Sequence, residues 1–244
     1  MPTPPRRPPL SELTVPAPGR PEVLQHHFRD LEQQKNASSF GMWVFIAQEI
    51  LFFGGLFATY TVYRSSYPDA FYAGSHHLNW RIGAFNTLVL IASSFTMAMA
   101  VYSAGMGRAR RIVGFLLATV LLGSVFLGVK YYEYSEKIRP CFGVGAGPGC
   151  LFPGERFDPS VLHLAGAEGE HAQIYFSLYF GMTGLHALHM IVGIPIILVI
   201  ALAAARGRYT PEWHTPVELV GLYWHFVDII WIFLFPLFYL VGAH

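Results

Sequence analysis

The residues most able to do chemistry in this sequence are ionisable side chains inside long apolar stretches. In chain order they are Glu49, His186, His189, Glu218, His225 and Asp228. Ionisable groups are costly in hydrocarbon, so each is a functional candidate wherever its stretch crosses a membrane. Carboxyl and imidazole groups there can exchange protons, hydrogen-bond between helices or bind metal ions. We expect the last five residues to form an intramembrane polar network.

Glu49 lies inside the apolar segment 43–53 with no basic residue of that segment within a helical turn. One interpretation is a carboxyl that exchanges protons or lies beside a lipid headgroup. The other is an acid that is hydrogen-bonded across a helix interface. The sequence leaves both interpretations open.

The two histidines His186 and His189 are three residues apart, so they share one face of a helix. Met182 lies on the same face before them and Gly193 after them, so only one end of the face permits close helix approach. Two histidines on one face could bind a metal. No third ligand of matching depth is evident, so we favour interhelical hydrogen bonding or lipid contact and expect no metal site.

The last apolar stretch contains three ionisable residues on neighbouring turns. Glu218 and His225 are seven residues apart, and Asp228 lies one turn beyond His225. His225 and Asp228 could pair locally, which would reduce the cost of burying both. Trp224 and Trp231, also seven residues apart, form an adjacent stripe that packing alone could explain.

The segments between apolar stretches contain further candidates. Arg206 and Arg208, followed by hydroxyl residues and by His214, suit the phosphate of a lipid headgroup, or they anchor the helix end at the membrane surface. The pair His26-His27 could collect protons, because histidine titrates near neutral pH.

The two cysteines, Cys141 and Cys150, lie in a segment rich in Gly and Pro. Their nine-residue separation permits a disulfide in an oxidising compartment. Two free thiols, or ligands of an external metal, are the alternatives. With no histidine beside them, the two thiols would make a poor metal site.

The composition indicates which class of protein contains these residues. Of 244 residues, 53% are hydrophobic and 13% charged, whereas a soluble domain has about 25% charged residues. The mean hydropathy is +0.41. A formal net charge of +1 argues against nucleic-acid binding through a broad basic surface. The chain is therefore predicted to be a polytopic membrane protein.

Helices of about 20 apolar residues span a bilayer, and five windows qualify: about 39–63, 83–105, 111–132, 172–204 and 217–242. The predicted fold is an all-α bundle of five transmembrane helices over residues 39–244. A proline-rich cytoplasmic arm over 1–38 precedes it, and an external loop occupies 133–171.

Basic residues predict the orientation, because cytoplasmic segments are enriched in Lys and Arg. One side would hold Arg6, Arg7, Arg20, Arg29, Lys35, Arg108, Arg110, Arg111, Arg206 and Arg208. The other would hold Arg64, Arg81, Lys130, Lys137, Arg139 and Arg156. The N-terminus is thus predicted to be cytoplasmic and the C-terminus periplasmic.

Five motifs in order resemble subunit III of the haem-copper respiratory oxidases, especially the bacterial cytochrome c oxidases. They are Glu49-Ile-Leu-Phe-Phe, Asn86-Thr, Tyr131-Tyr-Glu-Tyr, the run TGLHALHMIVG from Thr183, and the run GLYWHFVDIIWIFL from Gly221, preceded by Glu218. The resemblance covers about residues 36–242. It is to the short form, which lacks two helices that open the seven-helix form.

The resemblance implies an accessory subunit without a redox centre or cofactor of its own, in an enzyme that couples oxygen reduction to proton translocation. Haem and copper would belong to the partner subunits I and II. The expected roles are to stabilise subunit I, bind phospholipid and support proton uptake. Glu49 would be the family's buried carboxyl, near lipid or a proton path. The longer form holds lipid in a cleft closed by its first two helices, so a neighbouring subunit or bulk lipid would supply that wall here.

The resemblance also implies an assembly in the bacterial cytoplasmic membrane, with subunit IV or a respiratory supercomplex as further partners. A quinol oxidase subunit III and a nitric-oxide-reductase accessory protein remain alternatives within the family. Outside it, an independent haem or metal protein would use His186, His189 and His225. A proton-coupled transporter would use Glu49 and Asp228.

Overall fold

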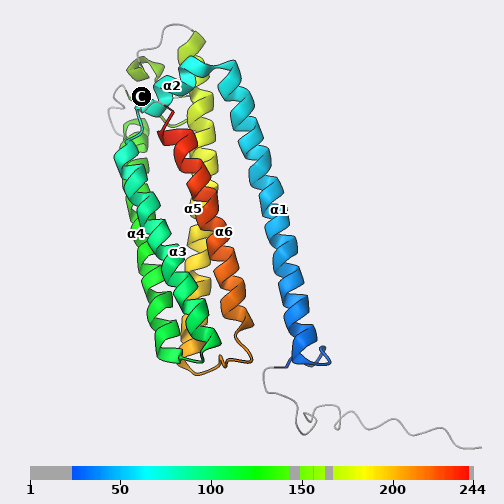
Figure 1. Ribbon diagram of the computed structural model, residues 1–244. Coiled ribbons are helices and arrows are strands. Elements are labelled where there is room, and N and C mark those ends of the chain that lie inside the picture. The colour runs from blue at the N-terminus through cyan, green and yellow to red at the C-terminus, as the bar shows by residue number, and fades with distance from the viewer. Residues whose placement is uncertain (1–23, 143–148, 156, 163–166, 242–244) are drawn as a thin grey trace, which may run out of the picture.

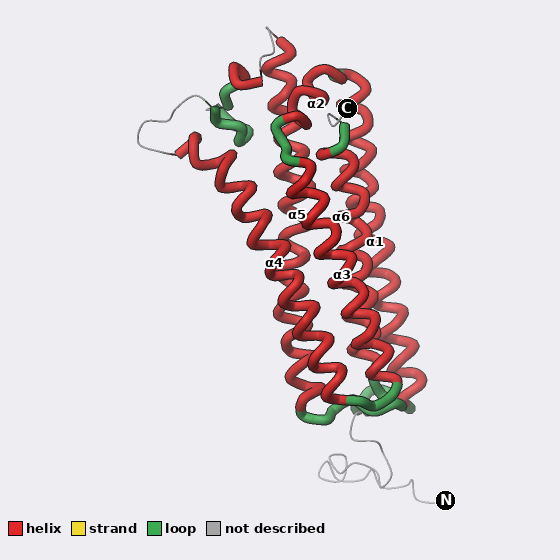
Figure 2. The backbone as a smooth tube through the Cα atoms, turned by 60° about the vertical axis from the view of Figure 1, so that its left-hand side comes forward, coloured by secondary structure: helices red, strands yellow, loops and turns green. Residues whose placement is uncertain are grey.

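The protein is an all-α bundle, as predicted (Figures 1 and 2). The computed structural model describes residues 24–142, 149–155, 157–162 and 167–241. Within these residues there is no β-strand. The elements are α1 (Leu31–Ser66), α2 (Pro68–His76), α3 (Trp80–Gly105), α4 (Ala109–Phe142), the 3₁₀ turn η2 (Pro159–Leu162), α5 (Ala167–Ala205) and α6 (Thr215–Tyr239).

The five long helices, α1 and α3 to α6, are each long and apolar enough to cross a membrane. Their 25 to 39 residues exceed the roughly 20 needed to span the hydrocarbon core. The short helix α2 was not predicted. It lies across one end of the bundle (Figure 1), with the side chain of Phe71 fully buried.

The predicted boundary of the N-terminal arm at residue 38 is wrong, because α1 begins at Leu31. The Asp30 side chain caps this helix by accepting a hydrogen bond from the Gln33 amide at 2.7 Å. Such a cap stabilises the first turn even where the residues are polar, and hydropathy does not register it. Residues 1–23 of the predicted arm lie outside the described residues.

The predicted external loop 133–171 is also wrong at both ends. Helix α4 continues to Phe142, and α5 already begins at Ala167. The charged residues that end the apolar window at 132 do not end the helix. Glu133 and Lys137 instead turn inward and are buried.

Helix α6 is the centre of the bundle, and its tryptophans fix its neighbours. Trp224 fits against two glycines: a Cβ at Gly123 would lie 3.0 Å from its ring, and one at Gly193 would lie 3.1 Å from it. Trp224 also donates its indole N–H to Ser93 on α3 at 3.0 Å, and Trp231 donates to Thr87 at 3.1 Å. The tryptophan stripe thus combines packing with hydrogen bonds.

Two connections close the end of the bundle opposite α2: the first joins α3 to α4, and the second joins α5 to α6. Gly107 ends the first of them with a φ of +67°, a left-handed conformation that favours glycine. A Cβ there would lie 3.1 Å from the Pro211 ring, so the first turn packs on the second.

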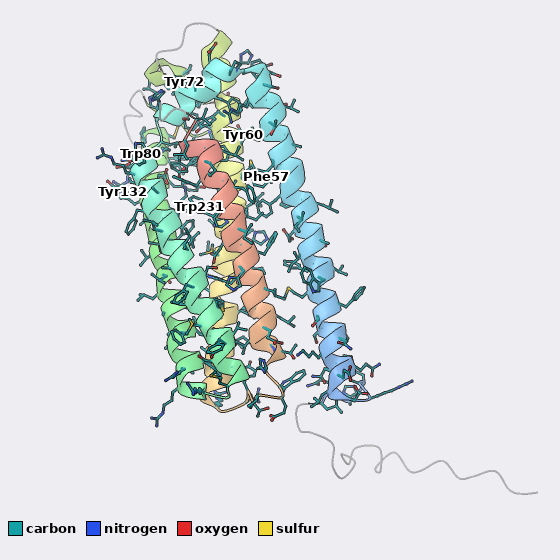
Figure 3. All side chains as sticks on the ribbon, viewed as in Figure 1. Phe57, Tyr60, Tyr72, Trp80, Tyr132 and Trp231 are labelled. Carbon is teal, nitrogen blue, oxygen red and sulfur yellow. A yellow bond between two sulfur atoms is a disulfide. The ribbon has the colours of Figure 1, made fainter. Side chains whose placement is uncertain are left out.

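Helix α1 lies at the edge of the bundle, against α5 and α6 (Figure 1). Large apolar side chains such as Trp43, Leu51 and Val62 are exposed along it. Side chains extend from α1 both toward α6 and away from the bundle (Figure 3). In a membrane, the outward side chains would face lipid or another subunit.

Candidate functional site

Glu49 of α1 faces His189 of α5, with 3.3 Å between Glu49 Oε2 and His189 Nε2. The other ring nitrogen, Nδ1, lies 2.8 Å from the Leu185 carbonyl oxygen. A carbonyl only accepts, so Nδ1 carries a proton. Nε2 is therefore the nitrogen that faces the Glu49 carboxyl. Sequence reasoning found both residues but not their pairing.

This pair borders an apolar pocket of about 400 Å³ between α1, α5 and α6. His189 forms part of the pocket wall. The remaining lining residues are Met42, Phe45, Leu188, Val192, Ile196, Val220 and Tyr223. Tyr223 donates its hydroxyl hydrogen to the His189 carbonyl oxygen at 2.8 Å, which ties α6 to the backbone beneath the imidazole.

His186 does not join His189, although the two share one helix face in sequence. Its ring is fully buried between Phe126, at 5.4 Å, and Trp231, at 5.2 Å. Neither ring nitrogen makes a hydrogen bond. Across the described part of the chain, no three His, Cys, Asp or Glu side chains are grouped to hold a metal ion.

Glu218 lies in the first turn of α6 rather than within the expected network. Its carboxylate is 3.3 Å from His214 Nε2 and 3.8 Å from Lys35 Nζ on α1. His214 was expected at a lipid headgroup, and the structure places it beside this carboxylate instead. The group links the start of α6 to α1.

The predicted local pair of His225 and Asp228 does not form among the described contacts. His225 Nδ1 instead lies 2.7 Å from the Ser94 hydroxyl of α3. Asp228 is 3% exposed, and neither carboxylate oxygen makes a hydrogen bond of good geometry. Serine on the facing helix offers His225 a partner that one-dimensional spacing could not reveal. The predicted five-residue network is therefore a set of separate contacts.

Arg206 and Arg208 line a polar pocket of about 710 Å³ at the end of the bundle where α1 begins. Tyr209, Thr210 and the buried Gln34 of α1 also line it. Burial raises the pKa of the Tyr209 hydroxyl, so this group stays a neutral donor. The pocket combines two guanidinium groups with hydroxyls, which suits an anionic oxygen ligand.

His26 and His27 are exposed just before α1, with their ring centroids 4.8 Å apart. They precede α1, at the end of the bundle where Arg206 and Arg208 line the polar pocket, which we call the arginine pocket. The structure thus leaves both imidazoles accessible, as a proton-collecting role would require.

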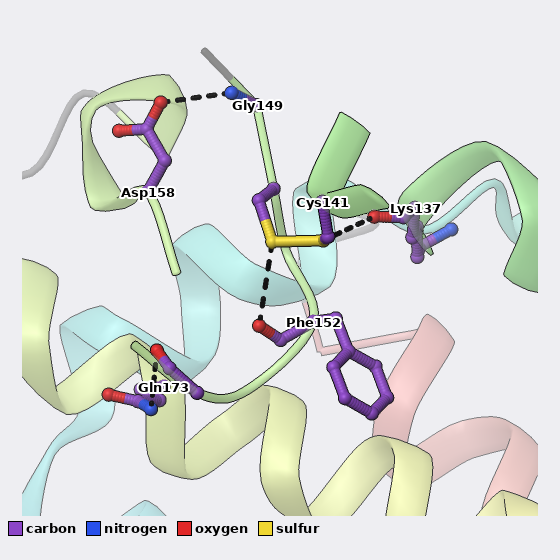
Figure 4. The surroundings of a disulfide bond; sticks show 8 residues. Lys137, Cys141, Gly149, Phe152, Asp158 and Gln173 are labelled. Atoms are coloured by element: carbon purple, nitrogen blue, oxygen red, sulfur yellow. Dashed lines mark hydrogen bonds between the residues drawn. A yellow bond between two sulfur atoms is a disulfide. The ribbon is translucent and has the colours of Figure 1, made fainter. Parts of the chain in front are cut away.

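Cys141 and Cys150 are joined in a disulfide, the pairing that the sequence permitted (Figure 4). The bond ties the last turn of α4 to the following segment. Nearby, the Asp158 carboxylate accepts hydrogen bonds from the Gly149 amide at 2.9 Å and from the Ser160 hydroxyl at 2.6 Å. The bonds from Ser160 and Gly149 lower the pKa of Asp158.

Sequence reasoning missed a buried charge cluster on α4, formed by Lys130, Glu133 and Lys137. The Lys130 side chain, 3% exposed, lies 2.9 Å from Glu133 Oε2. Lys137 Nζ lies 3.9 Å from the other carboxylate oxygen. The three residues occupy successive turns, so their i, i+3 and i, i+4 spacings were a readable signal.

Two tyrosines complete the charge cluster. Lys130 donates to the Tyr179 hydroxyl of α5 at 3.0 Å and to the Tyr239 hydroxyl of α6 at 2.8 Å. Tyr239 in turn donates to Glu133 at 2.8 Å. The cluster therefore joins α4, α5 and α6. In the sequence-based prediction, Lys130 and Lys137 served only as basic residues of the external side, which is why the cluster was missed.

Comparison with known proteins agrees with this architecture. The family profile of Cytochrome c oxidase subunit III matches residues 26–145 and 169–243. The chain is 31% identical to a cytochrome c oxidase subunit 3 of Corynebacterium diphtheriae, over 84% of this chain and 89% of that protein. It is also 31% identical to one of Thermostichus vulcanus, over 82% and 86%.

A further relative, a probable quinol oxidase subunit 3 of Staphylococcus saprophyticus, is 25% identical over 90% of this chain and 98% of that protein. The matched segments include α1, α3, α4 and α6 and nearly all of α5, with Glu49, His189 and the charge cluster, but not Cys150 or Asp158. The chain therefore belongs to the cytochrome c oxidase subunit III family of the haem-copper oxidases.

Proposed function

We propose that this chain is an accessory subunit of a proton-pumping cytochrome c oxidase and that the haem and copper are bound by the partner subunits I and II. The placement of its histidines carries this proposal. His186 is enclosed by aromatic rings, His189 is engaged by Glu49 and a carbonyl, and His225 is engaged by Ser94. The three imidazoles point to separate neighbours, so they do not converge on one ligand position.

The test is to purify the oxidase from cells that lack this chain. We expect the remaining complex to keep its haem and copper spectrum but to lose activity faster during turnover, because subunit I loses a stabilising neighbour. Haem or stoichiometric metal bound to the isolated chain would contradict the proposal and favour an independent metalloprotein.

Phospholipid binding is the second part of the proposed function. The arginine pocket would hold the headgroup, and the apolar pocket between α1, α5 and α6 would hold an acyl chain. The two pockets share the same three helices. Gln34 of the first and Met42 of the second are eight residues apart on α1, which is about 12 Å along a helix.

The lipid proposal is tested by native mass spectrometry of the purified complex. The double variant Arg206→Gln/Arg208→Gln is expected to lose at least one anionic phospholipid per chain. The matched control, Arg110→Gln/Arg111→Gln, removes two exposed charges from the neighbouring turn. Equal lipid retention in both variants would contradict the assignment of the headgroup pocket.

Support of proton uptake is the third part, and the pair of Glu49 and His189 is its candidate group. Glu49 Oε2 lies 3.3 Å from His189 Nε2, and His189 lines the apolar pocket. Glu49→Gln keeps the shape of the side chain but removes its exchangeable acid. We expect at least a twofold slower proton uptake, with Glu32→Gln, an exposed residue of the same helix, as the control.

The exposed pair His26-His27 is proposed as a proton-collecting antenna for the same path. His27→Gln is expected to slow proton uptake near neutral pH, where imidazole titrates. His76→Gln, at the opposite end of the bundle, is the control. Unchanged uptake and turnover in His27→Gln would count against the antenna.

The proposed location is the bacterial cytoplasmic membrane, with the N-terminus cytoplasmic and the C-terminus periplasmic. The ion pairs of Lys130 and Lys137 support this orientation, because they leave fewer free basic charges on the predicted periplasmic side. An alkaline phosphatase fused after His244 is expected to be active. An inactive, stably produced fusion would indicate the reverse orientation.

A quinol oxidase is the second candidate, favoured by one observation. The relative from Staphylococcus saprophyticus matches over nearly its whole length and is described as a probable quinol oxidase subunit 3. Assays of the purified complex with reduced cytochrome c and with a quinol separate the two candidates. Turnover with quinol alone would overturn the cytochrome c assignment.

A further inference from the structure

The charge cluster of Lys130, Glu133 and Lys137 contains more cationic than anionic groups. Its side chains are 3%, 3% and 8% exposed, in that order, and Glu133 is its one carboxyl group. With both lysines protonated, the cluster has a net charge of +1 inside the bundle. An uncompensated buried charge is costly, and a buried ionisable group avoids this cost by becoming neutral. Release of one proton would therefore leave the cluster neutral, with one cation for one carboxylate.

The other groups around the cluster supply no second buried negative charge. Glu136 of α4 is near enough to attract Lys137, but it is exposed, and solvent screens its charge. The charged residue of α3, Arg81, and the imidazole of His186 on α5 can add positive charge only. The remaining facing groups are phenols, which stay neutral near physiological pH. They are Tyr134, Tyr175, Tyr179 and Tyr239.

Lys130 is held in its protonated form by its surroundings. Its ammonium donates three hydrogen bonds, to one carboxylate and two hydroxyl oxygens, at 2.9, 3.0 and 2.8 Å. Only the protonated form of lysine has three N–H groups to donate. Lys130 Nζ also lies 5.0 to 5.5 Å from the centres of four aromatic rings, whose faces attract a cation.

Lys137 lacks this support. Its Nζ lies 3.9 Å from Glu133 Oε1, which is close enough for an ion pair but too long for a hydrogen bond. No hydrogen bond of this ammonium is found among the described residues, although the side chain is only 8% exposed. A buried donor without an acceptor is costly. Of the two buried lysines, Lys137 therefore gains less from its charge and releases its proton more easily.

The residue type fits a group that exchanges a proton. The chain contains thirteen arginines but only three lysines, which are Lys35, Lys130 and Lys137. A buried lysine can lose its proton, whereas an arginine stays charged in a protein. Two of the three lysines lie in the charge cluster, and the third, Lys35, is 52% exposed. Buried basic positions of this cluster are thus occupied by the residue that can become neutral.

We propose that the charge cluster is a proton-binding site, in which Lys137 binds and releases one proton near neutral pH and Glu133 supplies the counter-charge of the bound state. The proton moves between water and the lone pair of Lys137 Nζ, and no other bond changes. The inference goes beyond the proposed function, whose proton path uses Glu49 and His189 instead.

The position of Lys137 gives it the shorter route to water. It lies one turn before Cys141 (Figure 4) and five residues before the end of α4. Lys130 is seven residues deeper, which is about 10 Å along the helix. Lys137 is therefore the member of the cluster nearer to the end of the bundle where α2 lies, and the site would respond to the pH on the predicted periplasmic side.

The experiment uses nuclear magnetic resonance of the full chain in detergent, with carbon-13 at the ε-carbon of lysine. The variants Lys35→Arg and Lys137→Arg each remove one of the three signals and so assign all three. We expect the Lys137 signal to change from the ammonium to the amine position between about pH 6 and pH 9. The signals of Lys35 and Lys130 should stay at the ammonium position, because an exposed lysine titrates only near pH 10.4 and Lys130 is held by its partners.

A count of bound protons provides a second measurement on the same chain. Lys137→Met leaves one lysine for one carboxylate, so the variant should fold. In a potentiometric titration over the same pH range, it should bind one proton fewer than the wild-type chain. Lys35→Met, the matched control at the exposed lysine, should bind as many protons as the wild-type chain does.

Three outcomes would overturn the inference. They are a Lys137 signal that stays at the ammonium position up to about pH 9, a change of the Lys130 signal alone, or equal proton counts in Lys137→Met and Lys35→Met. Absence of the chain from the purified oxidase would overturn the proposed function instead, and it would leave the titration of Lys137 unaffected.

Discussion

Two buried charged regions of this molecule differ in how completely they are satisfied. In the charge cluster of Lys130, Glu133 and Lys137, every carboxylate oxygen has a cationic or hydroxyl partner from α4 or α6. In the groove between α3 and α6, Asp228 is equally buried beside the Ser94 hydroxyl, and no ion pair of it is found among the described residues. Both regions contain ionisable groups within spanning helices, yet only the charge cluster contains cations that balance its carboxylate.

The difference separates two uses of charge in a membrane helix bundle. A complete cluster contributes to this chain's own stability, since removal of one member leaves the others buried and unpaired. A buried carboxyl without a cation leaves no unpaired charge behind when it is replaced. Substitutions in the two regions should therefore have unequal effects on stability, and the following predictions test this from the largest effect to the smallest.

Glu133→Gln should have the largest effect. It leaves Lys130 and Lys137 buried beside each other without a counter-charge, which costs about 3–5 kcal/mol of unfolding free energy. The measurement is thermal or denaturant unfolding of the full chain in detergent. Glu136→Gln, an exposed acid on the same helix, is the control and should change stability little. Equal losses in both variants would contradict the cluster's role.

Removal of the disulfide should have the next largest effect. Cys141→Ser/Cys150→Ser opens a loop of nine-residue separation, and the loss should be about 2–3 kcal/mol. The change tests whether the charge cluster holds the end of α4 without this covalent link. Limited proteolysis should cut near residue 150 faster, while unfolding of the helices stays cooperative. Reduced wild-type protein should behave as the double variant does.

Asp228→Leu should change the free energy of unfolding of the isolated chain by no more than about 1 kcal/mol, because it removes a buried acid that has no cationic partner among the described residues. The same detergent unfolding assay measures it. A loss in the isolated chain as large as that of Glu133→Gln would show that Asp228 is satisfied internally, and the contrast between the two regions would disappear.

The smallest effect concerns Asp158, outside the spanning helices. Its hydrogen bonds lower its pKa in the folded chain, so it stabilises the segment above its unfolded pKa of about 4. This contribution to stability is lost as the pH falls through the lowered pKa that Asp158 has in the folded chain. Protection of the Gly149 amide from hydrogen exchange should therefore decrease in acid relative to Asp158→Asn at the same pH. An identical pH profile in the variant would contradict this.

The sequence predicted the helices better than the contacts between them. Hydropathy found all five spans because the requirement for an apolar membrane segment is local. It placed the end of the third span at residue 132, since it could not distinguish the inward-facing Glu133 from a solvated loop residue. It missed α2 and the first turns of α1, because a capping side chain and a short packed helix leave little hydropathy signal.

The sequence predicted which residues belong to the candidate site, but it did not predict which of them contact one another. Glu49 and His189 were each singled out, but they lie on different helices 140 residues apart. The expected pairing of His225 with Asp228 used spacing on one helix, whereas His225 actually contacts Ser94 on another. Spacing reports which residues share a face, and it carries no information about the facing helix.

By itself, the sequence determined the number of spanning helices, the family and the identity of most ionisable residues in the membrane. These follow from local hydropathy and from linear motifs. The tertiary structure alone decided that Glu49 meets His189, that Glu133 holds two lysines, and that Asp228 lies beside Ser94 of α3. The physical reason is that the energy of a buried charge depends on groups within a few ångströms, and in a helix bundle those groups come from distant parts of the chain.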